Sequence, residues 1–91
     1  MIQGGISVMF FQEGDAVVAY TPSLDLSTTG KDFEEARKRF GEVLRIFIRE
    51  LQEMGTLKEV LQEFGWIKSF ETEETWSPPH FLGHLEEQPL F

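Results

Sequence analysis

The chain has 91 residues, which is enough for one domain, and 41% of them are hydrophobic, a composition that argues against a disordered protein. It contains no cysteine, so disulfide scaffolds, thiolate metal sites and thiol chemistry are excluded. The net charge of −8 is uneven: residues 1–30 and 69–91 hold no lysine or arginine. Because phosphate binding needs clustered basic residues, we expect no direct nucleic-acid contact, and the acidic ends allow a basic protein partner.

The first third of the chain predicts a β-hairpin and a third strand. Alternating apolar residues predict a strand over 5–12, and the pair Gly14-Asp15 predicts the turn to an antiparallel strand over 16–21. Pro22 ends this strand because proline cannot donate a ladder hydrogen bond. Residues 26–29 predict a short third strand.

Two helices are predicted next, each begun by a capping box. Asp32–Glu35 begins a long amphipathic helix over 33–54, which Gly55 ends. Residues 56–59 have the same pattern and begin a short helix that reaches residue 64.

The whole pattern predicts an α+β fold in the order β-β-β-α-α-β: an antiparallel sheet of three to four strands with both helices on one face. Residues 66–70 supply the last strand. Gly41 predicts a close packing contact inside the long helix, where glycine costs up to ~1 kcal/mol relative to alanine. We divide the chain into an α+β domain, 1–70, and an acidic, aromatic C-terminal extension, 71–91.

The stretch EGDAVVAYTPSLDLSTTGKDFEEARKRFGEVLRIFIREL, residues 13–51, resembles the HicB-like antitoxin family. Members of that family have a strand that enters a Y/C-x-P-x-L turn, a polar strand that ends in glycine, and a capped helix with an E-E-A step. The likeness covers about residues 6–66. The matching positions are Tyr20, Pro22, Leu24, Gly30, Asp32, Glu34-Glu35-Ala36 and Phe47 to Leu51.

This resemblance implies a partial ribonuclease-H-like fold without the nuclease site, and a non-enzymatic antitoxin that neutralises a small basic RNA-cleaving toxin of the HicA type. Many members carry a further DNA-binding domain, but no lysine or arginine follows Lys68 here, so a stand-alone domain is expected. The alternative is a homo-oligomeric adaptor or structural protein of the same fold without a toxin.

The expected partner-binding surface is the sheet edge near residues 20–26 together with the acidic run at the start of the extension. Exposure and negative charge are the reasons for this choice, and the acidic run is equally well explained as a solubilising linker. The candidate residues are Tyr20, Pro22, Leu24, Asp25, Glu71, Glu73 and Glu74.

A homodimer contact is expected on the second face of the sheet. Met9, Phe11, Val17 and Ala19 are interpreted as apolar residues of that face. Residues of the aromatic extension, chiefly Trp76 and Phe81, either cover this face in their own chain or cross to a second subunit.

No catalytic or metal site is predicted, and no cofactor. Asp15 and Asp25 lie in predicted turns and Asp32 caps a helix, so backbone geometry accounts for them. His80 and His84 have a helical ligand spacing, but the surrounding prolines and glycine disfavour a helix there. The first residues lack the basic charge of a secretory signal and no apolar run has membrane-spanning length, so we expect a cytoplasmic protein without membrane contact.

Overall fold

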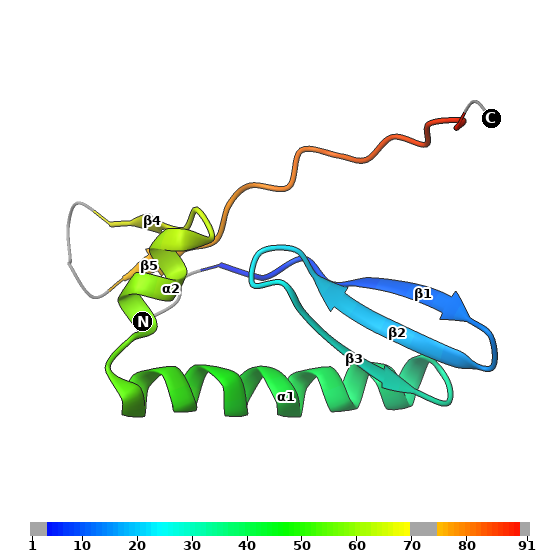
Figure 1. The fold of residues 1–91 in the computed structure, drawn as a ribbon, viewed down its shortest axis with the longest axis horizontal. Coiled ribbons are helices and arrows are strands. Elements are labelled where there is room, and N and C mark those ends of the chain that lie inside the picture. The colour runs from blue at the N-terminus through cyan, green and yellow to red at the C-terminus, as the bar shows by residue number, and fades with distance from the viewer. Residues whose placement is uncertain (1–3, 70–74, 90–91) are drawn as a thin grey trace.

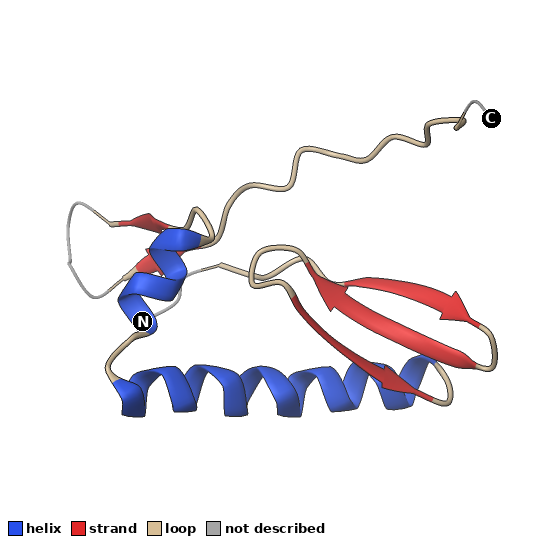
Figure 2. Cartoon of the chain, viewed as in Figure 1, coloured by secondary structure: helices blue, strands red, loops and turns tan. Residues whose placement is uncertain are grey.

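The structure is a computed structural model that describes residues 4–69 and 75–89. Three strands are followed by a long and a short helix, and two very short strands come last (Figures 1 and 2). The elements are β1 (Met9–Glu13), β2 (Ala16–Thr21), β3 (Leu26–Gly30), α1 (Phe33–Met54), α2 (Leu57–Glu63), β4 (Ile67–Lys68) and β5 (Trp76–Ser77).

The predicted α+β fold is confirmed, with an antiparallel sheet in the order β1-β2-β3 followed by two helices. The two-residue turn at Gly14-Asp15 sets the register, which pairs Phe10 with Ala19 and, across β2, Ala19 with Thr28. The N-terminal half of α1 lies against one face of this sheet, and Figure 1 shows the helix running along it and well beyond it.

The expected fourth strand forms, but it does not join the three-stranded sheet. β4 pairs instead with β5 in a separate two-stranded sheet, in which Lys68 lies opposite Trp76. The short helix α2 packs against α1, beyond the end of the sheet (Figure 1). The strand that closes this second sheet, β5, comes from the expected extension, 71–91.

Two hydrophobic clusters hold these layers together. The first lies between the sheet and α1 and is centred on the buried Ala19, Ala36 and Phe40. The second lies where α2 and the two-stranded sheet meet the other half of α1. Leu26 and Leu44 pack against both clusters and therefore join them. The buried residues of the second cluster are Leu24, Leu61, Trp66 and Trp76.

The close glycine contact is at Gly30, and the expectation for Gly41 is wrong. A Cβ atom on Gly30 would overlap the backbone nitrogen of Ala36 and lie 2.8 Å from its Cα, whereas one on Gly41 would meet only the Arg45 guanidinium at 3.9 Å. The absence of a side chain at Gly30 therefore lets the end of β3 lie directly on the first turn of α1.

The two predicted helix caps have different outcomes. Asp32 accepts a hydrogen bond from the backbone N–H of Glu35 at 2.8 Å, and the Glu35 carboxylate accepts one from the N–H of Lys31. Gly55 ends α1 with a left-handed φ of 71°. The capping box at α2 is wrong, because Thr56 makes no side-chain cap hydrogen bond and its buried Oγ1 has no partner within the described part of the chain.

Candidate protein-interaction surfaces

The corner between β2 and β3 is fixed to the far end of the fold. The indole Nε1 of Trp66 donates a hydrogen bond to the Ser23 carbonyl at 2.8 Å, across 43 residues of sequence. Leu24 is only 2% exposed and lies in the second hydrophobic cluster, so it cannot contact a partner directly. Within this corner, Pro22 and Asp25 remain exposed.

Tyr20 and Asp25 form a polar pair on the surface of the same corner. The Tyr20 hydroxyl donates to Asp25 Oδ1 at 3.0 Å, and Asp25 has a φ of 49°, a left-handed conformation that aspartate tolerates better than most residues. This hydrogen bond, together with partial burial and the nearby negative charge, raises the pKa of Tyr20. The neutral phenol is thus the form that the fold favours.

The sheet face opposite α1 carries an apolar strip. The register places Met9 beside Tyr20 and Phe11 beside Val18 on this outer face, and Phe11 is 49% exposed. No helix of the described chain packs there (Figure 1). We call this strip, Met9, Phe11, Val18 and Tyr20, the outer face. The expectation that Val17 and Ala19 belong to it is wrong, because both pack toward α1.

The charges around the outer face have one sign. Glu13 lies on this face at the end of β1, Asp15 is exposed in the adjoining turn, and Asp25 is exposed at the opposite end. The three strands and their turns contain no lysine or arginine, since the first basic residue of the chain is Lys31. The surface is therefore both apolar and acidic, which suits a basic protein better than a nucleic acid.

The extension contributes less to the expected surfaces than the sequence suggests. Glu71, Glu73 and Glu74 lie outside the described residues. Trp76 is 6% exposed and belongs to the core of its own chain, so it is not available for an oligomer contact. Phe81, by contrast, is 54% exposed.

The acidic residues and histidines of the described chain do not converge. Asp15 lies in the hairpin turn, Asp25 in the corner and Asp32 at the start of α1. Residues 80–84 are irregular, so the spacing of His80 and His84 does not place them on one helical face. Within residues 4–69 and 75–89 no group of three or more potential ligands could hold a metal ion.

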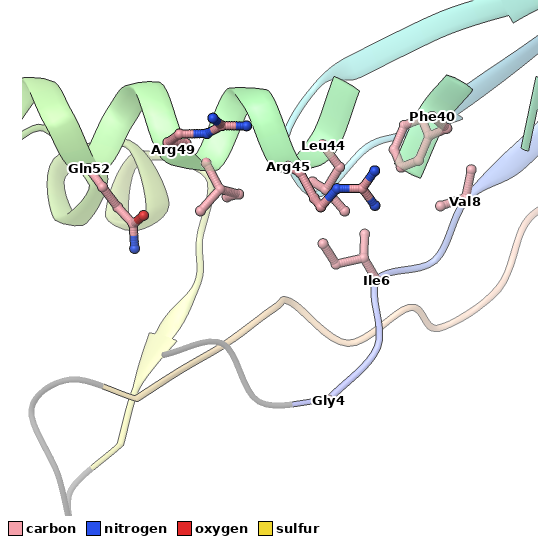
Figure 3. Close-up of a pocket in the computed structure, with 9 residues that line it drawn as sticks. Gly4, Ile6, Val8, Phe40, Leu44, Arg45, Arg49 and Gln52 are labelled. Atoms are coloured by element: carbon pink, nitrogen blue, oxygen red, sulfur yellow. The ribbon is translucent and has the colours of Figure 1, made fainter. Parts of the chain in front are cut away.

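Sequence reasoning missed an apolar groove between α1 and the segment that leads into β1. The predicted first strand begins at residue 5, but β1 begins at Met9, and the preceding residues run extended beside α1. Ile6 and Val8 point from this segment toward Phe40 and Leu44 (Figure 3). The groove has a volume of about 650 Å³. Its lining residues are Gly4, Ile6, Val8, Phe40, Leu44, Arg45, Ile48, Arg49 and Gln52.

Comparisons with known proteins add no relative: no protein-family model matches the chain, and neither the curated proteins nor the solved structures give a match. In the described residues, no helix combines the length and the apolar character that crossing a membrane requires.

Proposed function

We propose that this chain is a non-enzymatic binding module of the antitoxin type, which neutralises a small basic ribonuclease of the HicA type by covering its positive surface. The observation that carries the proposal is the outer face, which is apolar, bordered by acidic residues and left uncovered by α1. The resemblance of residues 13–51 to HicB-like antitoxins supports the choice of partner.

The chemistry of this face supports binding. A ribonuclease binds RNA through basic residues, and an acidic surface without basic residues attracts such a protein and speeds the encounter. Phe11 and Met9 would then supply the water-excluding contact, because exposed aromatic and methionine side chains are enriched at interface centres. Pro22 and Asp25 lie at the edge of the same surface and would contribute contacts at its rim.

The test is affinity purification of the chain from its native cell at low salt, with the substitution Phe11→Asp as the disrupting variant. Ile46→Asp is the matched control, because Ile46 is also 49% exposed but lies on α1. We expect the wild type and the control to retain a small basic protein that cleaves RNA by itself and loses this activity when the chain is added.

Three outcomes would contradict the proposal: no basic protein is retained, the retained protein does not cleave RNA, or Phe11→Asp retains it as well as Ile46→Asp does. Raising the salt concentration should weaken retention, because salt screens the attraction between exposed charges, largely beyond about 10 Å at 0.1 M and at shorter distances as the concentration rises.

A further inference from the structure

The C-terminal segment, which we define as residues 82–89, has two leucine side chains that the described residues leave largely exposed. Leu82 is 97% exposed and Leu85 is 78% exposed, and the segment runs extended away from the fold (Figure 1). Glu86 and Glu87 follow the second leucine directly. The segment therefore presents two leucines and then two carboxylates.

The groove between α1 and the segment before β1 has the complementary chemistry. Its floor is apolar, formed by residues such as Ile6, Phe40 and Leu44, and its rim carries Arg45 and Arg49 (Figure 3). Neither arginine forms an ion pair within the described residues. The arginines that form one there are Arg37 and Arg39. The backbone positions of Arg45 and Arg49 are about one helical turn apart, about 6 Å along the axis of α1.

The start of the extension lies on the wrong side to fill this groove in its own chain. Ser7 lines two pockets together with residues 78–81, whereas Ile6 and Val8, which alternate with it, line the groove against α1. The extended segment before β1 thus stands between the groove and the base of its own extension. A second copy can enter the groove without crossing that segment.

We infer that two copies exchange their C-terminal segments, each placing Leu82 and Leu85 in the groove of the other and Glu86 and Glu87 against Arg45 and Arg49. The exchange is reciprocal, so every contact occurs twice and the assembly closes as a two-fold dimer. The exchange uses neither the outer face nor the corner of the sheet, so it does not depend on the proposed antitoxin role.

Two charge-reversed variants of the full chain test the exchange: Arg45→Glu with Arg49→Glu, and Glu86→Lys with Glu87→Lys. Each variant alone places like charges at both contacts, so its dimer dissociation constant should rise at least about 10-fold above that of the wild type. An equimolar mixture of the two variants restores opposite charges at both contacts of the mixed dimer. Sedimentation equilibrium should therefore show monomers for each variant and dimers for the mixture.

The control is Lys38→Glu with Lys58→Glu, which changes the net charge as much as the arginine variant does but affects residues outside the groove. It should dimerise as the wild type does, and circular dichroism should show that all variants are folded. A monomeric wild type would overturn the inference, since it would indicate no exchange or a segment bound in its own chain. A mixture that remains monomeric would also overturn it, as would variants that dimerise normally.

Discussion

Trp66 and Ser23 are joined by a hydrogen bond of 2.8 Å from the indole Nε1 to the backbone carbonyl, and this bond ties the β2–β3 corner to the segment between α2 and β4. It is part-buried and lies beside a core cluster that contains both Leu24 and Trp66. The corner is thus positioned by a residue 43 places further along the chain. The residues of the corner therefore contribute mainly to the fold, and only Pro22 and Asp25 among them are exposed.

We predict that Trp66→Phe destabilises the protein by about 2 kcal/mol, because the Ser23 carbonyl loses its donor and remains partly shielded from water. Chemical denaturation followed by circular dichroism measures this change. Ile67→Ala is the control, since Ile67 is adjacent but 54% exposed, and it should shift the free energy of unfolding by no more than about 0.5 kcal/mol. Equal effects of the two substitutions would contradict the role of the hydrogen bond.

Alanine at the two glycines should have opposite effects. Gly30→Ala forces a methyl group against the backbone of Ala36, which cannot move without displacing α1, and should cost about 1–3 kcal/mol. Gly41→Ala meets only a flexible guanidinium group and should stabilise α1 by up to about 1 kcal/mol. Thermal unfolding of both variants gives the comparison, and a loss of stability in Gly41→Ala would show that this position is packed after all.

Substitutions at the N-cap residues of the two helices, Asp32 and Thr56, should also differ in their effect on stability. Asp32→Ala removes a cap that accepts a hydrogen bond and should cost about 1 kcal/mol. Thr56→Val replaces a buried hydroxyl that has no partner within the described residues, so it should leave the stability unchanged or raise it slightly. Urea midpoints of the two variants test this, and a substantial loss in Thr56→Val would indicate that its hydroxyl is satisfied in solution.

Tyr20 should titrate above its ordinary pKa of 10.0, since the hydrogen bond to Asp25 favours the neutral phenol. The stabilisation from this raised pKa is fully present below pH 10.0 and is lost as the pH rises through the pKa of the folded protein. Because Tyr20 is the single tyrosine, the ultraviolet absorbance of phenolate follows it directly.

The substitution that tests this shift is Asp25→Gly, which removes the acceptor and suits the positive φ at that position. The pKa of Tyr20 should then fall back toward 10.0. Glu13→Gln, which removes a carboxylate that does not contact Tyr20, should leave the titration unchanged. A titration that is the same in the wild type and in Asp25→Gly would refute the assignment.

Local signals in the sequence predicted the three strands of the main sheet and both helices, because a hairpin turn, a helix cap and a terminal glycine each act over a few residues. The assignment of residues of the second strand to the outer face of the sheet was wrong because it ignored the register of the hairpin. A two-residue turn pairs Glu13 with Ala16, and continued pairing puts Phe11 opposite Val18, so the turn already excluded Val17 and Ala19 from the outer face.

Other features depend on contacts between distant parts of the chain. No local sequence pattern indicates the pairing of β4 with β5 or the close approach of Gly30 to α1, since each depends on how separate elements pack. One sequence signal could have indicated the groove: Arg45 and Arg49 directly follow Leu44 and Ile48. This pattern places positive charge at the border of the apolar stripe of α1. Only the extended course of residues 4–8 turns that border into a groove.

The two edges of the three-stranded sheet differ in how readily they can pair with a strand of another molecule, and Arg39 is one cause of the difference. Its guanidinium donates to the Thr29 carbonyl at 3.2 Å, and α1 lies along β3, so that edge is guarded against strand addition. Growth of the sheet from molecule to molecule requires two receptive edges, and β1 is the edge that remains. Edge-to-edge association of this sheet would therefore join β1 to β1 and would not continue through β3, where Arg39 already donates to a carbonyl.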